Sequence, residues 1–373
     1  MPKYTPYELG SICTRLSSGK GIPAKQVLEE GTFPVYGGNG LRGYADHSNF
    51  KGECAIIGRQ GAFCGNVRYF SGEAYMTEHA VVVCANDDNS TRYLSYLLSL
   101  MNLRRLSGQS AQPGLSVKTL AKQIVELPPL DIQNKVVSIL SGIESKIVIN
   151  EKINDNLQRQ AELLYHDRFE TVDRSNLPVN WRIVRLGDVA IISKKSFNPA
   201  KEPEILLEHY SIPAFDEAHF PVFELSTAIK SNKFIVDSTC FMISKLNPTT
   251  KRVWKPYCLT ENSVCSTEFI VYKAKRQEIT DFLYSVIDSS SFSDFMCSHV
   301  TGSTGSRQRT TPSDTLAFKL ILPTAEEIAE YQGIVTPMFK QIKCNAIEND
   351  NLKRLRDSLL PKLMNGEIDV SAI

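Results

Sequence analysis

Several features that would assign a function at once are missing from this chain of 373 residues. It has no run of about 18 apolar residues, and its start, MPKYTPYELG, lacks a basic segment followed by an apolar one. We therefore expect neither a membrane span nor a signal peptide. The nine cysteines include no C-x-x-C pair, and only Cys297 and His299 lie close enough to suggest paired metal ligands. We expect reduced thiols in a cytoplasmic protein that binds no metal.

Motifs for catalysis are also missing. A methyltransferase would carry a glycine-rich cofactor loop and an N/D-P-P-aromatic loop for the target base. The glycine-rich loop is missing, and N-P-T-T at 247–250 resembles the second loop only superficially. Asp131 with E-S-K at 144–146 resembles the acidic motif of a nuclease, but these residues fall on a predicted helix. The six histidines accompany no nucleophile motif. We expect no catalytic residues, and the formal net charge of +1 neither favours nor excludes nucleic-acid binding.

The chain does contain an internal repeat. The tetrapeptide N-D-N-L occurs at 154–157 and again at 349–352, a spacing of 195 residues. The same offset aligns neighbouring residues at steps of 4, 3, 4 and 3, which is typical of a coiled-coil seam. The aligned pairs are Ile143 with Met338, Ile147 with Ile342, Asn150 with Asn345, Asn154 with Asn349, Leu157 with Leu352 and Leu164 with Leu359. At the seam position between the last two pairs, Ala161 aligns with Arg356, and the match is interrupted.

Each copy of the repeat predicts a long helix. Leu-Pro precedes both, at 127–128 and 322–323, and the proline ends the strand before it. Thr324 and Glu327 fit a capping box, and Asp131 is a candidate N-cap. We expect helices at about 131–170 and 325–360, with the second kinked at Pro337 and ended near Pro361.

Two copies of one seam favour an antiparallel pair of helices, because a two-fold repeat relates them. The alternative is that each helix packs alone against its own domain. In the paired arrangement Asn150, Asn154, Asn345 and Asn349 occupy seam positions, where buried polar residues fix the register at some cost in stability.

A globular region precedes each helix. The two regions open alike, with Y-E-L-G-S-I at 7–12 and V-R-L-G-D-V at 184–189. Buried strands are predicted at 54–58, 80–83, 234–236, 241–243 and 269–272, and shorter helices at 90–106 and 277–298. We expect domains at 1–128 and 177–322 and helical spacers at 129–176 and 323–373. The fold class is α+β, with two mixed α/β domains, two long helices paired as an antiparallel coiled coil, and a pseudo-two-fold internal repeat.

Loops in both domains carry side chains suited to DNA. The glycine-rich stretch 37–44 predicts a tight hairpin, and G-R-Q-G at 58–61 follows a buried strand. Arginine and glutamine form paired hydrogen bonds with guanine and adenine edges, and glycine lets a backbone approach a groove closely. The candidates in the first domain are Lys20, Tyr36, Asn39, Arg42, Tyr44, Arg59, Gln60, Arg68, Gln109, Ser110 and Gln112. For each of them a solvated surface loop is the alternative.

In the second domain, a basic segment with an aromatic residue spans 245–255, and a polar stretch at 306–310 precedes the long helix. The candidates there are Lys194, Lys195, Lys245, Asn247, Thr250, Lys251, Arg252, Trp254, Arg307, Gln308 and Arg309. Base specificity is expected to depend mainly on Arg42, Arg59, Gln60 and Arg68 in one domain and on Lys251, Arg252, Arg307 and Arg309 in the other.

Taken in order, these motifs resemble the specificity (S) subunit of type I restriction–modification systems. They are F-P-V-Y-G-G-N-G at 33–40, I-I-G-R-Q-G at 56–61, Q-P-G-L-S at 112–116, L-P-P-L at 127–130 and L-L-P-K-L-M-N-G-E-I at 359–368. The resemblance covers essentially the whole chain. It implies two target-recognition domains, each followed by a helical spacer, in a non-catalytic subunit that binds double-stranded DNA.

The resemblance also implies partners. Two modification subunits would bind S-adenosylmethionine and methylate adenine, and restriction subunits would join a larger complex that cleaves DNA. No cofactor is expected on this chain, and no membrane. Because the second domain lacks the glycine-rich hairpin, we expect the two domains to recognise different halves of an asymmetric target. The alternative from a different class is a coiled-coil scaffold whose two globular domains bind protein or carbohydrate.

Overall fold

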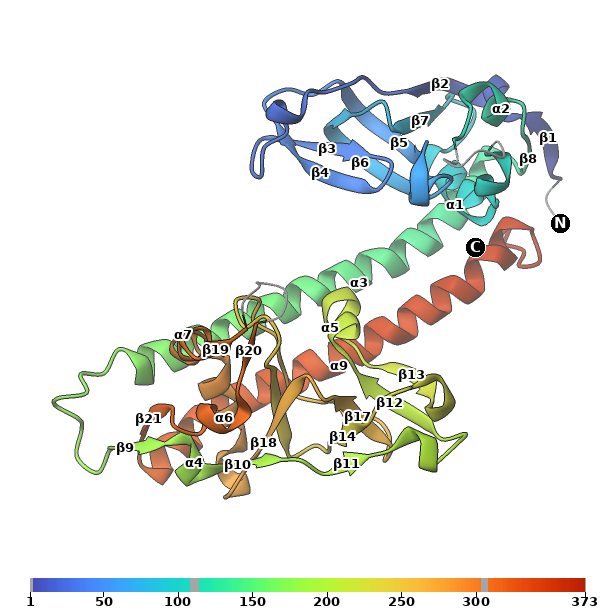
Figure 1. Ribbon diagram of the computed structural model, residues 1–373. Helices are drawn as coiled ribbons and strands as arrows, with labels where there is room; N and C mark the ends of the chain where they lie inside the picture. The colour runs from blue at the N-terminus through green and yellow to red at the C-terminus, as the bar shows by residue number, and fades with distance from the viewer. Residues whose placement is uncertain (1–2, 108–113, 303–307, 373) are drawn as a thin grey trace. The chain divides into compact units, whose positions relative to one another are not determined.

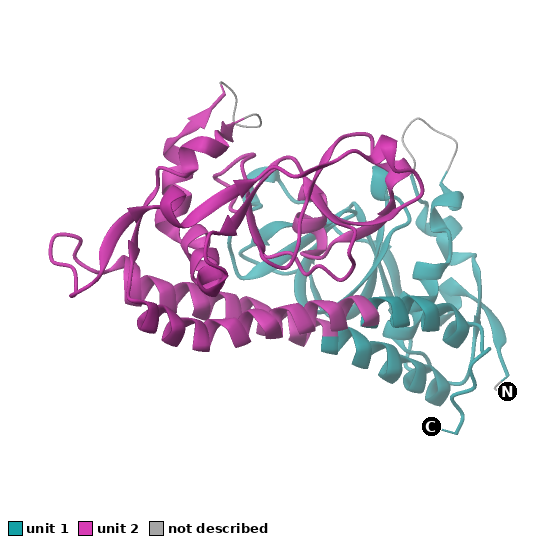
Figure 2. Ribbon diagram, turned by 90° about the horizontal axis from the view of Figure 1, so that it is seen from below, with its two compact units in different colours: residues 1–146, 352–373 teal, residues 147–351 magenta. Residues whose placement is uncertain are grey.

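The computed structural model describes residues 3–107, 114–302 and 308–372, and the chain divides into two compact units. Unit 1 comprises residues 1–146 and 352–373, and unit 2 comprises residues 147–351 (Figure 2). The two long helices, α3 (Leu130–Tyr165) and α9 (Ala325–Met364), each contribute one part to unit 1 and the other part to unit 2.

Unit 1 is built around a six-stranded sheet with the order β2-β7-β5-β6-β3-β4 (Figure 1). Its strands are β2 (Cys13–Ser18), β3 (Phe33–Gly37), β4 (Gly40–Ala45), β5 (Phe50–Gly58), β6 (Val67–Met76) and β7 (Ala80–Ala85). Neighbouring strands are antiparallel except β3 and β6, which are parallel. Outside this sheet, β1 (Thr5–Glu8) pairs with β8 (Ile124–Leu127), and the helices are α1 (Thr91–Leu100) and α2 (Val117–Ala121).

The end of the chain completes the core of unit 1. Leu363, Met364 and Val370 are buried in the same apolar cluster as α1, β5 and β7, and Leu140 of α3 joins them. The Tyr4 hydroxyl donates to the backbone carbonyl of Leu363 at 3.5 Å. Unit 1 therefore depends on a segment that the chain supplies only after the whole of unit 2.

Unit 2 contains two main sheets, with the orders β10-β18-β15-β16 and β11-β14-β17-β12-β13. The strands of the first are β10 (Ala190–Ser193), β15 (Cys240–Ser244), β16 (Val253–Trp254) and β18 (Phe269–Ala274). Those of the second are β11 (Ser196–Phe197), β12 (Leu206–Tyr210), β13 (Val222–Leu225), β14 (Lys233–Ile235) and β17 (Ser263–Ser266). Two short pairs complete the strands, β9 (Arg182–Arg185) with β21 (Lys319–Leu322) and β19 (Val300–Thr301) with β20 (Arg309–Thr310).

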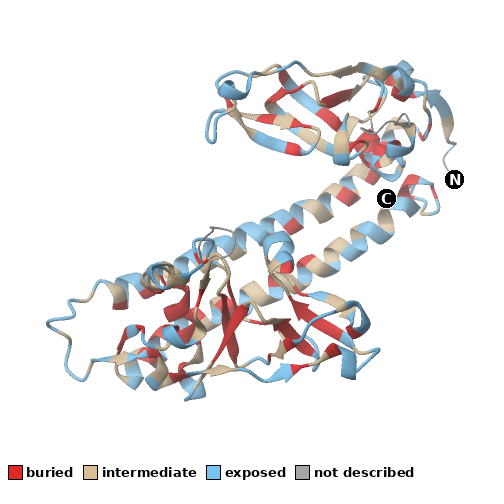
Figure 3. Cartoon of the chain, in the orientation of Figure 1, coloured by how far each residue is buried: buried red, intermediate tan, exposed pale blue. Residues whose placement is uncertain are grey.

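The long helices are part of the core of unit 2. The shorter helices are α4 (Leu186–Val189), α5 (Ile212–Ala218), α6 (Thr280–Asp288), α7 (Ser290–Ser298) and α8 (Pro312–Thr315). Tyr165 of α3, Tyr331 of α9 and Phe282 of α6 lie in one cluster of buried aromatic rings, with centroids about 6 Å apart. In Figure 3 the buried residues, coloured red, lie along the strands of unit 2 and at intervals along the long helices.

The predicted elements are largely confirmed, with corrections at their ends. The first helix begins at Leu130, so Asp131 lies in its first turn and is not the N-cap. It ends at Tyr165, and a π-helical turn, η5 (His166–Glu170), follows it. The second helix continues past both prolines and ends at Met364 rather than near Pro361. The region expected as one helix at 277–298 is two helices, because Ser289 caps α7.

The capping box at the start of α9 is confirmed. The Glu327 backbone N–H donates to Thr324 Oγ1 at 3.3 Å, and the Thr324 N–H donates to Glu327 Oε2 at 3.0 Å. In the part of the chain that the structure describes, no helix combines the length and the hydrophobicity that a membrane span requires.

The pseudo-two-fold repeat extends beyond the helices. Strands β8 and β21 stand at the offset of 195 residues, and so do the starts of α3 and α9. The Leu9 N–H donates to the Gln123 carbonyl, and the Leu186 N–H donates to the Phe318 carbonyl, both at 2.8 Å. The joint between each domain and its long helix is thus built twice from equivalent backbone contacts.

Within unit 2 the two long helices pair in antiparallel directions through their asparagines. Asn150 Nδ2 donates to Asn349 Oδ1 at 2.9 Å, and Asn345 Nδ2 donates to Asn154 Oδ1 at 2.8 Å. The two-fold repeat maps one bond onto the other, since Asn150 corresponds to Asn345 and Asn154 to Asn349. The antiparallel coiled coil predicted from the repeat is confirmed.

The same asparagines also bond to the backbone of the facing helix. Asn154 Nδ2 donates to the Ile342 carbonyl and Asn349 Nδ2 to the Ile147 carbonyl, both at 3.3 Å. These bonds are again related by the repeat. A shift of one helix along the other would leave the buried amides without partners, which is costly in a low-dielectric seam.

Replacing Leu363 with alanine is expected to destabilise unit 1 by about 2–5 kcal/mol, because it opens a cavity where the end of the chain completes the core. Leu355 on the same helix is 48% exposed, so Leu355→Ala is the matched control and should change little. Hydrogen exchange measured peptide by peptide checks this. Equal loss of protection in units 1 and 2 would contradict it.

Changing Asn150, Asn154, Asn345 and Asn349 together to leucine is expected to raise the melting temperature while loosening the register. Asn150 Oδ1 has no hydrogen-bond partner among the described residues, and apolar replacement of a buried polar pair gains on the order of 1 kcal/mol. Thermal melting measures the first effect, and the distance distribution between one spin label on each helix measures the second. A lower melting temperature or an unchanged narrow distribution would count against the prediction.

Candidate nucleic-acid interface

Three loops meet at one end of the large sheet in unit 1. They are the tip of the β3–β4 hairpin, the loop after β5 and the turn between β6 and β7. The Arg59 N–H donates to the His79 carbonyl at 2.9 Å, and the Thr77 N–H donates to the Tyr36 carbonyl at 2.9 Å. A Cβ on Gly38 would lie 3.0 Å from the His79 carbonyl oxygen, so the hairpin tip needs glycine there.

The predicted hairpin is confirmed, and its glycines make room for arginine side chains. Gly40 has φ +99°, a conformation that L side chains rarely adopt, and a Cβ there would lie 3.1 Å from the Arg68 guanidinium carbon. A Cβ on Gly37 would lie 2.7 Å from Cδ of Arg42. The two arginines therefore lie against the hairpin from which the sequence predicted DNA contacts.

The side chains of this loop cluster are largely available to a ligand. Arg42 and Arg68 are exposed, and neither has a carboxylate within ion-pair distance in the described ranges. Arg59 is half-buried, and its Nη1 donates to the Glu78 carbonyl at 3.5 Å. Burial raises the pKa of Tyr36, Tyr44 raises it further, and Arg68 lowers it, so these three polar side chains lie near one another.

The remaining candidates of unit 1 have different positions. Lys20 is exposed, and its backbone N–H donates to the Met76 carbonyl at 2.9 Å, just before the β6–β7 turn. Asn39 forms the exposed hairpin tip, and exposed Gln60 makes an isolated bridge to Gly114. Gln109, Ser110 and Gln112 lie outside the described residues.

In unit 2 the segment 245–250 lies against the strand β20. The Lys245 N–H donates to the Glu268 carbonyl at 2.9 Å, and the Asn247 N–H donates to the Gln308 carbonyl at 3.0 Å. Leu246 and Arg309 form an isolated antiparallel bridge. The structure thus brings Lys245, Asn247, Gln308 and Arg309 together, with Thr250 exposed in the same loop. Arg307 lies outside the described residues.

Carboxylates hold several of the basic side chains of unit 2. Arg252 makes a two-point contact with Asp216 at 2.6 and 2.9 Å, and Arg309 makes one with Glu268 at 3.0 and 3.2 Å. Hydrogen bonding raises the pKa of Arg309 and lowers that of Asp216. An arginine in such a contact must give up its carboxylate before it can pair with a base. The basic groups of the two units therefore differ in their availability.

Trp254 is a correction to the predicted contacts. It is 1% exposed, and its ring lies 4.7 Å from that of Tyr210 and 5.4 Å from that of Phe215. A side chain enclosed in this way is part of the core and not of a DNA-facing surface. Lys194 and Lys195 are exposed between β10 and β11.

Sequence reasoning missed one feature that the two units share. The loop after β5 bonds to the turn at Glu78 and His79, and the loop after β15 bonds to Glu268. Both turns contain the dipeptide Thr-Glu, at 77–78 and 267–268. That dipeptide was the available signal, because it marks the turn beside each candidate recognition loop.

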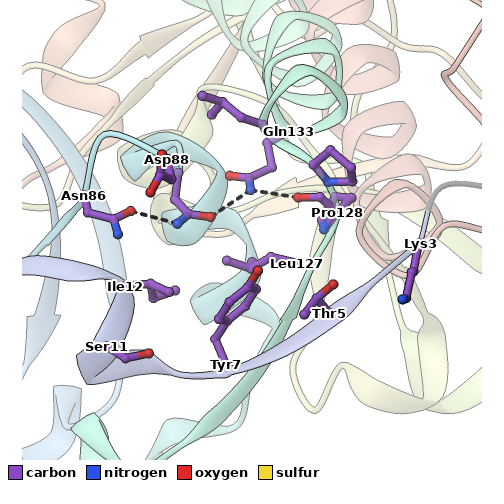
Figure 4. Close-up of a pocket in the computed structure, with 13 residues that line it drawn as sticks. Lys3, Thr5, Tyr7, Ser11, Ile12, Asn86, Asp88, Leu127, Pro128 and Gln133 are labelled. Carbon is purple, nitrogen blue, oxygen red and sulfur yellow. Dashed lines mark hydrogen bonds between the residues drawn. The ribbon is translucent and has the colours of Figure 1, made fainter.

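A separate polar cavity of about 370 Å³ in unit 1 lies beside the start of α3 (Figure 4). Gln133 is buried there, and its Nε2 donates to Asn89 Oδ1 and to the Pro128 carbonyl, both at 2.9 Å. Its Oε1 accepts from the Ser90 N–H at 2.9 Å. These bonds attach the first turn of α3 to the turn before α1. Both the nitrogen and the oxygen of the Gln133 amide take part in them. This arrangement anchors the start of α3.

Comparison with known proteins finds similarity to the same family that the motifs resemble. Residues 1–159 match the model of the type I restriction modification DNA specificity domain. In this region the chain is similar to type I specificity subunits. It is 37% identical over 141 residues to the EcoprrI specificity subunit of Escherichia coli, covering 37% of this chain and 35% of that one. It is 25% identical over 335 residues to the MjaIX specificity subunit of Methanocaldococcus jannaschii, covering 78% and 72%.

The fold is also that of a type I S subunit. The crystal structure of the S subunit from M. genitalium superposes with a TM-score of 0.67 at 15% identity, over 97% of this chain and 96% of that one. The predicted α+β fold class is therefore confirmed. The matched segment spans about a third of the EcoprrI subunit.

Proposed function

We propose that this chain is the DNA sequence-specificity subunit of a type I restriction–modification complex and recognises a two-part, asymmetric target. The observation that carries the proposal is the pair of unlike domains, each joined to one of two antiparallel helices at an equivalent joint. Because the joints and helices are repeated while the sequences of the candidate recognition loops differ, each domain is free to recognise a different half-site.

The helices would fix the distance between the half-sites. At 1.5 Å per residue, the 36 residues of α3 and the 40 of α9 span roughly 54 and 60 Å. Domains on one face of B-DNA must be about 34–36 Å apart, or a multiple of that distance. The buried asparagines give the pair a single register, so the unread spacer between the half-sites would have a fixed length.

The chain itself would perform no chemistry. Its relatives are named specificity subunits. Two modification subunits would supply S-adenosylmethionine and methylate adenine, and restriction subunits would join them for cleavage. The net charge of +1 is compatible with this division, because partner subunits can neutralise further phosphates.

Within unit 1, Arg42, Arg59, Gln60 and Arg68 are proposed to contact bases, with Lys20, Tyr36, Asn39 and Tyr44 beside them. In unit 2 the proposed contacts are Lys245, Asn247, Thr250, Gln308 and Arg309, with Lys194 and Lys195 as phosphate contacts. Arg309 would exchange Glu268 for a base on binding.

Selection of duplexes from a random pool by the complete complex tests the function. Replacing Arg68 with alanine should relax selection at one base pair and cost about 1–3 kcal/mol there. Arg252→Ala is the matched comparison in unit 2 and should mainly lower stability, because it leaves Asp216 without its partner. Equal weakening on every sequence would show that Arg68 contacts phosphate. A complex that enriches no sequence would favour the scaffold alternative.

Lengthening both helices tests the fixed spacer. Seven residues inserted after Lys146 in α3 and after Asn351 in α9 preserve the heptad and add about 10 Å, so the preferred spacer should grow by about three base pairs. The control places the same seven residues in the exposed segment 173–176. An unchanged spacer after the helix insertions would refute the idea.

A further inference from the structure

The segment Lys251–Tyr257 follows the candidate recognition loop 245–250 and contacts both long helices. On the side of α3, Lys251 Nζ lies 2.5 Å from Oε1 of Glu162. The same Nζ lies 3.0 Å from Oδ1 of Asp288, the last residue of α6, and donates to its backbone carbonyl at 2.8 Å. One lysine therefore joins the end of the loop to α3 and to the core.

The partner carboxylate of Lys251 is deeply buried. The side chain of Asp288 is 7% exposed, and Gln158 of α3 donates a short hydrogen bond to it. Burial raises the pKa of Asp288 to about 7, while Lys251 acts in the opposite direction. The charged form of Asp288 thus depends on this lysine, and removing Lys251 would leave a buried acid without its cation.

A second contact reaches α9. Lys255 Nζ pairs with Oδ1 of Asp281 on α6, and Asp281 Oδ2 accepts from the Thr336 hydroxyl on α9 at 2.5 Å. Lys255 Nζ also lies 5.6 Å from the centre of the Phe339 ring on α9. Further along, Lys343 of α9 donates to the Tyr257 carbonyl at 2.6 Å.

The residues between these contacts leave the segment little freedom. Trp254 is enclosed in the core, and β16 pairs with β15 through Met242 opposite Trp254 and Ile243 opposite Val253. A displacement of either helix would therefore be transmitted to the segment, and the chain passes directly from it into the 245–250 loop.

Contact with DNA is the competing role for Lys251, and its surroundings argue against it. To reach a phosphate, the lysine would have to leave Glu162 and the buried Asp288. Within the described part of the chain, the exposed Thr250 and the half-buried Lys245 of the same loop form no hydrogen bond or ion pair with either long helix.

We propose that Lys251 and Lys255 are positioning residues that attach the second recognition loop to the helix pair, so that spacer length rather than base identity depends on them. This inference rests on the proposed function. The inference goes beyond the proposed function because it assigns part of the spacer selectivity to the second domain and not to helix length alone.

Glu162→Gln separates the two roles, because it breaks the contact to α3 and leaves the charge of Lys251 for DNA. The full-length chain, assembled with its modification subunits, is offered duplexes with randomised half-sites and spacers of different lengths. Glu162→Gln and Lys251→Met should keep the half-site sequence and accept neighbouring spacers, with discrimination falling about tenfold, the usual effect of losing a charged hydrogen bond. The double variant should be no more permissive than either single one.

Lys245→Met is the control, because it changes a lysine of the same loop that is not tied to the helices. It should affect affinity or base preference and leave the spacer unchanged. If Lys251→Met unfolds the domain, Thr336→Val tests the contact to α9 in its place and should broaden the spacer in the same way. Melting curves and hydrogen exchange of 245–257 accompany each variant, with faster exchange expected in Glu162→Gln.

Two results would overturn the inference. One is a single unchanged spacer in Glu162→Gln and Thr336→Val. The other is an altered base preference in Lys251→Met together with an unchanged base preference and an unchanged spacer in Glu162→Gln. That result would make Lys251 a DNA contact. A complex of the unaltered chain that selects no two-part sequence would instead refute the proposed function itself.

Discussion

The structure depends on one constraint, namely that the side-chain amides in the seam between two helices must form hydrogen bonds with each other. Asn150 with Asn349 and Asn154 with Asn345 satisfy this requirement in a single alignment of α3 and α9. An apolar seam would tolerate several alignments at similar energy. The amides remove that choice within unit 2, and the elements of this unit that pack on the helices inherit a defined position along them.

The repeat made much of this arrangement predictable. An offset of 195 residues aligns β8 with β21 and Leu130 with Ala325 in the sequence, and it identifies the four asparagines from the sequence alone. The ends of the helices were less predictable. Pro361 normally marks the end of a helix, yet α9 continues because Leu363 and Met364 complete the core of unit 1. Such tertiary burial leaves no local signal in the sequence.

The candidate contacts show a similar division. In unit 1 the glycine pattern correctly indicated a hairpin that lies against Arg42 and Arg68. In unit 2 the basic residues were visible in the sequence, but their carboxylate partners were not. Asp216 and Glu162 lie 36 and 89 residues from the basic residues that they hold. Residue type alone therefore could not separate a contact surface from an internal attachment.

Unit 1 is interrupted in the chain, and this affects how the protein is made. Its first 146 residues leave the ribosome long before residues 352–373, which carry the last buried side chains of its core. Domains generally fold in order from the N-terminus during synthesis, but the core of this one cannot be completed before residues 352–373 have been made. An incomplete nascent chain would expose the apolar surface that Leu363, Met364 and Val370 later cover. A product that stops before residue 352 would thus carry an unfinished core in the unit whose synthesis began first.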